Sequence, residues 1–204
     1  VGGLSMMIAG FAPIHATASG FTQQQVATLM FAMPLGTLFV QIPLGWISDR
    51  TDRRHVLIAA ALLVVGAGLL AGVLDGSALV VLIVVYMVWD GASESIYSLA
   101  TAHAGDRASR DEMVQLQSTM LFAWSLSGFV VPGLGTLLTG LYGTVAFIWV
   151  AVAIAAAYAA FVAWRLTQAD AAPPSDTVNF APLPATAPLP VELTATEQVE
   201  ASSR

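Results

Sequence analysis

A cluster of charges between two long apolar runs constrains this chain more than any other feature. Five of the six residues from 49 to 54 are charged: Asp49, Arg50, Asp52, Arg53 and Arg54. The flanking apolar runs, at about 26–47 and 56–74, are each close to the ~20 residues that an α-helix needs to cross a bilayer core. We therefore expect the cluster to form a short turn at a membrane surface, joining two spans.

The composition indicates an integral membrane protein. The chain is 57% hydrophobic and 10% charged, with a mean hydropathy of +0.77. A soluble domain of this composition would expose much of its apolar surface. Hydrophobic length predicts an all-α polytopic protein with six transmembrane helices, at about residues 3–20, 26–47, 56–74, 78–100, 114–138 and 143–165.

The cationic residues lie on one side of these predicted spans. The links alternate between nearly uncharged and charged ones, and lysine is absent from the chain. All seven cations are arginines on the charged side: Arg50, Arg53, Arg54, Arg107, Arg110, Arg165 and Arg204. The positive-inside rule makes this side cytoplasmic. We expect a multi-pass protein of the inner (plasma) membrane, with both ends of this chain in the cytoplasm.

The two ends of the chain differ in composition. Val1 opens the first predicted span without an initiator Met or a basic flank, so we expect the chain to be N-terminally incomplete. Residues 1–166 are predicted to form a six-helix half-bundle. Residues 167–204 are rich in Pro, Ala, Thr and acids, and this composition predicts a disordered cytoplasmic tail.

The fourth predicted span carries ionisable groups at helical spacing. Its polar residues fall at offsets of four, seven, eight and eleven, hence on one stripe of a helix: Tyr86, Asp90, Ser93, Glu94 and Tyr97. An ionisable group within a span costs about 2.5–3.5 kcal/mol on insertion scales and usually faces an aqueous cavity or a partner. Asp90 and Glu94 are therefore candidates for proton or substrate handling, with helix–helix contact as the alternative.

Other spans supply weaker signals. His15, near the outer end of the first span, can exchange protons near neutral pH, although a polar packing contact is the alternative for a lone histidine. The third and sixth spans carry few hydrogen-bonding side chains and are predicted to be lipid-facing scaffold. Gly68-x-x-x-Gly72 in the third span predicts a surface on which another helix can lie close.

The charged turn resembles a known family motif. Gly45-x-Ile-x-Asp49-Arg50-x-x-Arg53-Arg54 resembles the loop motif G-x-L-a-D-r-x-G-R-r of the major facilitator superfamily, between the second and third helices of a six-helix half. It departs at Asp52, where the family usually has glycine, which puts the family's tight backbone turn in doubt.

This resemblance implies one half of a twelve-helix transporter with alternating access, in which the first and fourth helices of each half line a central site. Those helices carry His15 and Asp90 here. The resemblance also implies that Asp49, Arg50, Arg53 and Arg54 latch the outward-open state, with Gly45 allowing close helix approach. The acidic tail and the absence of a long basic central loop favour the C-terminal half.

The sequence therefore predicts a secondary transporter for a small solute, proton-coupled through Asp90 or Glu94, with the bilayer and a missing N-terminal half or a second copy as partners. The alternative is a six-helix membrane scaffold or regulatory subunit. An enzyme is disfavoured, because the chain has no H-E-x-x-H, G-x-S-x-G or phosphate-loop motif. No cofactor and no metal site are predicted, and the confinement of the cations to a membrane surface argues against nucleic-acid binding.

Overall fold

The computed structural model describes residues 2–74 and 79–168, and every regular element within them is helical. The chain order is α1 (Gly2–Ala18), α2 (Gln23–Ser48), α3 (Arg53–Val73), α4 (Leu79–Gly105), the 3-10 turn η1 (Arg110–Glu112), α5 (Met113–Tyr142) and α6 (Ala146–Leu166). The first residue of the predicted fourth span and residues 169–204 of the predicted tail lie outside the described residues.

Five helices, α2 to α6, are long and apolar enough to cross a membrane. α1 has 17 residues, at the lower end of the ~17–25 residues of spanning helices, and is not among those five. Over the described residues, the structure confirms the all-helical fold and gives five candidate membrane-spanning helices. The count of six spans stays a prediction.

Local chemistry explains where several helices begin and end. Thr22 caps α2 in a capping box: its backbone N–H donates to Gln25 Oε1 at 2.8 Å, and its Oγ1 accepts from the Gln25 N–H at 3.4 Å. Asp52 caps α3, since its carboxylate accepts from the Arg54 N–H at 3.0 Å. α5 ends at Gly143, whose φ of +90° suits glycine.

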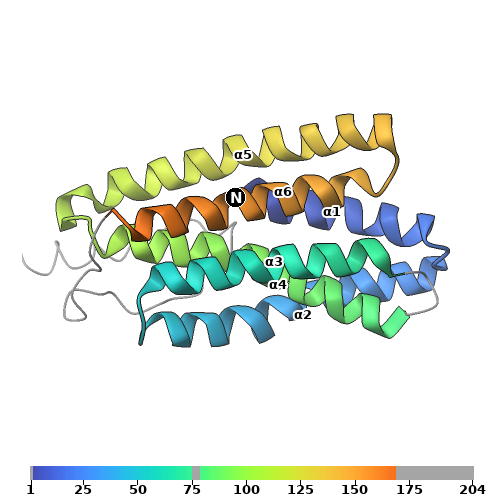
Figure 1. The fold of residues 1–204 in the computed structure, drawn as a ribbon, viewed down its shortest axis with the longest axis horizontal. Helices are drawn as coiled ribbons and strands as arrows, with labels where there is room; N and C mark the ends of the chain where they lie inside the picture. Colours follow the sequence, from blue (N-terminus) through green and yellow to red (C-terminus); the bar gives the residue numbers. More distant parts are fainter. Residues whose placement is uncertain (1, 75–78, 169–204) are drawn as a thin grey trace, which may run out of the picture.

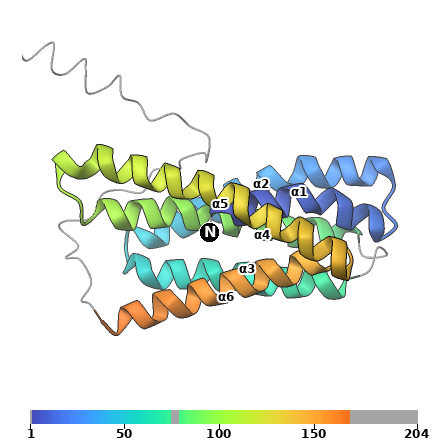
Figure 2. The same cartoon turned by 90° about the horizontal axis from the view of Figure 1, so that it is seen from above.

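The helices lie side by side along the long axis of the bundle (Figure 1; Figure 2). α2 packs mainly on α4, α3 on both α4 and α6, and α1 on α5. α4 is the most buried of the five candidate spans and α5 the least. Any side chain on the inner faces of α4 is therefore enclosed by several neighbours.

Glycines set the closest helix crossings. A Cβ on Gly36 of α2 would collide with the Met87 carbonyl of α4, and one on Gly91 of α4 would collide with the Gly36 carbonyl. The two backbones touch there, as small residues allow. In the predicted Gly68-x-x-x-Gly72 surface, a Cβ on Gly68 would lie 2.9 Å from a methyl group of Val152 in α6, which confirms it as a packing face.

Candidate functional site

A polar contact joins the last turn of α1 and the first half of α4. Tyr86 Oη and His15 Nδ1 lie 3.0 Å apart, and both side chains are buried. Phe147 of α6 packs against the His15 ring, with the ring centroids 5.9 Å apart. The sequence placed His15 and Tyr86 on different spans, and the fold brings them together as hydrogen-bond partners.

A second contact joins the same two helices farther along. The Glu94 carboxyl of α4 interacts with the Ser5 side chain of α1, whose hydroxyl donates to the Gly2 carbonyl at 3.2 Å. His15 and Ser5 are about 15 Å apart along their helix, and Tyr86 and Glu94 about 12 Å along theirs, at 1.5 Å per residue. The two contacts therefore belong to one antiparallel α1–α4 pairing.

Asp90 lies between these contacts along α4, one helical turn from Tyr86 and one from Glu94. Its side chain is buried, at 8% exposed, next to the point where Gly91 meets Gly36 of α2. Within residues 2–74 and 79–168, no hydrogen bond or ion pair reaches its carboxyl. The carboxyl that interacts with it electrostatically is that of Glu94. Asp90 is thus a buried acid without a cationic neighbour among the described side chains.

The other two members of the predicted stripe, Ser93 and Tyr97, contact their own helix and α5. The Ser93 hydroxyl donates to the Asp90 carbonyl at 2.9 Å, so it serves its own helix backbone. Tyr97 lies beside Trp124 of α5, with ring centroids 6.3 Å apart. Tyr86 and Glu94 are therefore the stripe members whose side chains contact α1.

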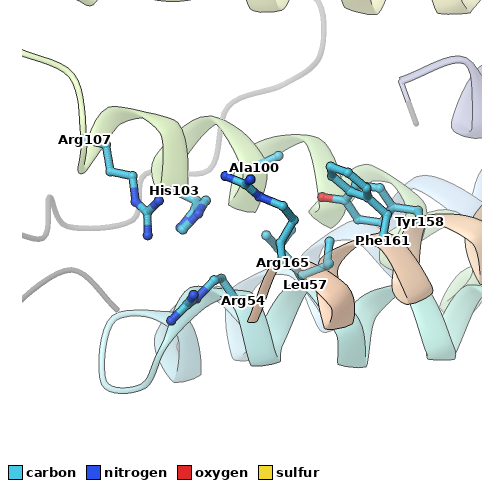
Figure 3. A pocket seen from close by; sticks show the side chains of 9 residues that line it. Arg54, Leu57, Ala100, His103, Arg107, Tyr158, Phe161 and Arg165 are labelled. Atoms are coloured by element: carbon cyan, nitrogen blue, oxygen red, sulfur yellow. The ribbon is translucent and has the colours of Figure 1, made fainter. Parts of the chain in front are cut away.

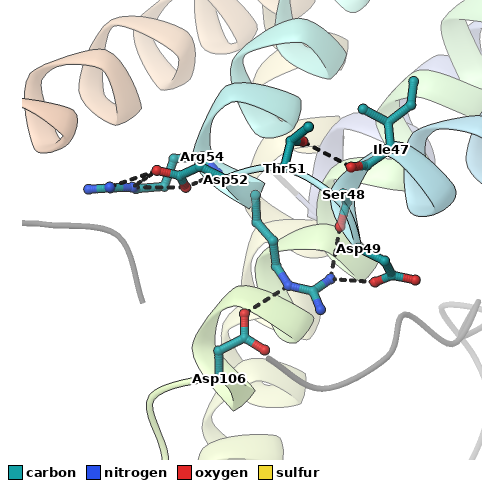
Figure 4. A network of polar contacts seen from close by, with 8 residues as sticks. Ile47, Ser48, Asp49, Thr51, Asp52, Arg54 and Asp106 are labelled. Atoms are coloured by element: carbon teal, nitrogen blue, oxygen red, sulfur yellow. Dashed lines mark hydrogen bonds and ion pairs between the residues drawn. The ribbon is translucent and has the colours of Figure 1, made fainter. Parts of the chain in front are cut away.

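The charged turn is organised around the buried side chain of Arg53, whose partners Ser48, Asp49 and Asp106 are labelled in Figure 4. Its Nε lies 2.8 Å from Asp106 Oδ2, just beyond the end of α4. Its Nη1 lies 3.3 Å from Asp49 Oδ1 and donates to Ser48 Oγ at 2.8 Å. One guanidinium thus joins the end of α2, the start of α3 and the end of α4.

The arginine next to it makes a local pair. Arg54 Nη2 lies 2.7 Å from Asp52 Oδ2, and this side-chain hydrogen bond lowers the pKa of Asp52 below its usual value. Asp52 has φ −62° and ψ 116°, a backbone conformation open to any residue. The departure from the motif's glycine therefore costs no backbone strain here, and the aspartate gains a role as helix cap.

Arg50 and Gly45 lie at the end of α2. The Arg50 guanidinium stacks on the Trp46 ring at 4.0 Å from its centroid, and Nη1 donates to the Trp46 carbonyl at 3.0 Å. Gly45 is buried, and its carbonyl accepts the Asp49 N–H at 3.0 Å. The Arg53 side chain, by contrast with that of Arg50, links three helices.

Two further polar partners were not among the candidate site residues predicted from the sequence. Asp106 carried no signal beyond its place after an apolar span. Gln41 of α2 donates from Nε2 to Ser98 Oγ of α4 at 2.6 Å. This bond is buried, and it ties together the same two helices that cross at Gly36 and Gly91.

A comparison with protein families gives a match over most of the chain. The family model described as Major Facilitator Superfamily matches residues 1–198. Neither the curated proteins nor the solved structures gave a match to the chain. The match covers every described helix.

Proposed function

The chain belongs to the Major Facilitator Superfamily, and on that premise we propose that it forms a six-helix half of a secondary transporter that moves a small solute by alternating access. Members of this family are membrane transporters rather than enzymes. The single observation that carries the proposal is the buried Asp90 on α4, placed between two polar contacts to α1.

Asp90 is the proposed proton-coupling group. An ionisable side chain at membrane depth is expensive to keep, and it marks proton or substrate pathways unless a partner neutralises it. A carboxyl without a cationic neighbour can bind a proton when its surroundings change. Glu94, one turn away, is the second acid of the same path, and the His15–Tyr86 pair closes its outer side.

The Arg53 cluster is the proposed latch. Alternating access requires helix ends on one side of the membrane to separate and rejoin. The contacts of Arg53 with Asp49 and Asp106 hold three helix ends together. We place this latch at the cytoplasmic side of the inner membrane, with both ends of this chain there, on the basis of the arginine distribution.

The exposed face of α5 is where we propose that a partner of this six-helix half packs. Gln115, Ser118, Ser125 and Thr136 are exposed there, on a helix that is the least buried of the candidate spans. Polar side chains in a span more often face protein or water than lipid. We therefore place α5 against a second six-helix half, either in the same polypeptide or in another copy.

The proposal is tested on the full-length protein in proteoliposomes that contain a pH-sensitive dye. A panel of sugars, carboxylates, amino acids and organic cations is added outside, and proton movement is recorded for each solute. We expect one class of solute to move protons, and Asp90→Asn to abolish this movement while the protein stays folded. Asp111→Asn, at an exposed position outside the membrane helices, is the matched control.

Two results would contradict the proposal. Proton-coupled accumulation at the wild-type rate by Asp90→Asn would remove Asp90 from the coupling role. Failure of every solute class to cross, with protein that is folded and inserted, would favour the alternative of a membrane scaffold or regulatory subunit.

A further inference from the structure

A cavity of about 320 Å³ lies between α3, α4 and α6, away from the α1–α4 contacts (Figure 3). It sits where α3 begins and where α4 and α6 end. Its volume is within the ~300–1,000 Å³ of small-molecule sites. None of the proposed coupling residues lines it, so its role is separate from the solute path.

Arginine and histidine side chains gather around this cavity from all three helices. Arg54 comes from the start of α3, His103 and Arg107 from the end of α4, and Arg165 from the last turn of α6. No Asp or Glu is among its described lining residues. Asp52, which does not line the cavity, pairs with Arg54 and offsets part of its charge. Three arginines and no acid are thus among the described residues that line the cavity.

The other lining residues are apolar or aromatic. Leu57, Ala100, Tyr158, Phe161 and Val162 form the part that runs along the helices away from their charged ends. Phe161 is 54% exposed and neighbours Trp164 in a ring contact. Exposed aromatic rings beside arginines at a helix end are typical of the membrane interface.

We propose that this cavity binds the phosphate group of an anionic phospholipid. Arginine forks recognise phosphate oxygens with paired hydrogen bonds. Basic pockets between transmembrane helices on the positively charged side suit acidic lipid head groups. The head group lies between Arg107 and Arg165, with the Asp52-paired Arg54 at its edge, and an acyl chain follows the apolar surface at Phe161. The apolar part of the cavity favours a lipid over free phosphate, because free phosphate would contact the arginines alone.

Native mass spectrometry on the full-length protein tests this site. The protein is purified in mild detergent, stripped of lipid, and titrated with phosphatidylglycerol or with phosphatidylcholine of the same acyl chains. We expect phosphatidylglycerol to bind and phosphatidylcholine to bind at least tenfold more weakly. Loss of one arginine at the membrane surface weakens binding of an anionic lipid about fivefold, so Arg165→Gln and Arg107→Gln are each expected to do so.

Arg50→Gln is the charge-matched control for lipid retention. Arg50 is exposed on Trp46, at the same end of the bundle but outside the cavity. Equal weakening by Arg50→Gln and Arg165→Gln would show a general surface attraction and overturn the site. Arg165 is exposed, so its variant folds, and an unchanged elution volume verifies this.

A separate arm distinguishes the two sources of phosphate. Inorganic phosphate is added in excess over the lipid to the protein loaded with phosphatidylglycerol. We expect no displacement of the lipid. Displacement that depends on Arg165 and Arg107 would assign the cavity to a soluble phosphate anion and overturn the lipid assignment. Equal binding of phosphatidylglycerol and phosphatidylcholine would overturn recognition of an anion altogether.

Discussion

The guanidinium of Arg53, at the first residue of α3, lies 2.8 Å from the carboxylate of Asp106, just past the end of α4. Both side chains are only 2% exposed. The pair thus ties together two helix ends that are far apart in the sequence, and it does so at the motif by which the family is recognised.

Removing the acid of this pair is expected to destabilise the protein. Asp106→Asn removes a negative charge that balances the buried Arg53 guanidinium. Removing one partner of a buried ion pair costs about 3 kcal/mol of stability. The remaining contacts to Asp49 and Ser48 moderate this loss. Thermal unfolding in detergent measures it, and Asp111→Asn is the matched control at an exposed site. Equal melting temperatures for the two variants would contradict a structural role for Asp106.

The two aspartates of the charged turn are expected to differ in transport. Asp49 pairs with the central Arg53, whereas Asp52 caps α3 and pairs with its neighbour Arg54. Asparagine caps a helix about as well as aspartate, so Asp52→Asn keeps the turn. Asp49→Asn removes about 1 kcal/mol of latch contact and is expected to slow transport about fivefold. Wild-type rates for both variants would remove the latch assignment.

The Asp52 cap predicts a specific pH dependence of stability. The hydrogen bond from Arg54 lowers the folded-state pKa of Asp52. The stabilisation of the folded state by the ionised Asp52 carboxylate is therefore fully present above its unfolded pKa of about 3.9. It is lost as pH falls through the lower folded pKa. The wild type is therefore expected to melt above Asp52→Asn at pH 6, with the difference shrinking below about pH 4. A difference that is constant over this range would contradict the pairing.

Alanine substitution is expected to have opposite effects on stability at a glycine of the α2–α4 crossing and at a glycine in open space. Gly36→Ala places a methyl group against the Met87 carbonyl, so the helices must separate and the melting temperature falls. Gly66→Ala in α3 meets open space, and it gains up to about 1 kcal/mol from better helix propensity. Thermal unfolding of the two variants checks this. A Gly36→Ala protein as stable as the wild type would show that the backbones do not touch.

The membrane helices could be predicted because their signals are local. Hydrophobic length alone located α2 to α6, and the charged turn with its spacing at Asp49 and Arg53 identified the family. The helical period put Tyr86, Asp90 and Glu94 on one stripe of α4. Such features depend on the residues within one span and on the cost of placing polar groups in lipid.

Only the tertiary structure decided which residues meet. The pairs His15–Tyr86, Arg53–Asp106 and Gly36–Gly91 join helices that are distant in the sequence, and their partners depend on where the helices cross and how each one is rotated. Hydrophobic periodicity sets neither quantity, since lipid tails are as apolar as the side chains that they surround. By itself, the sequence determined a membrane protein and predicted that its arginines lie on one side. Close packing of glycines and buried polar pairs decided how its helices fit together.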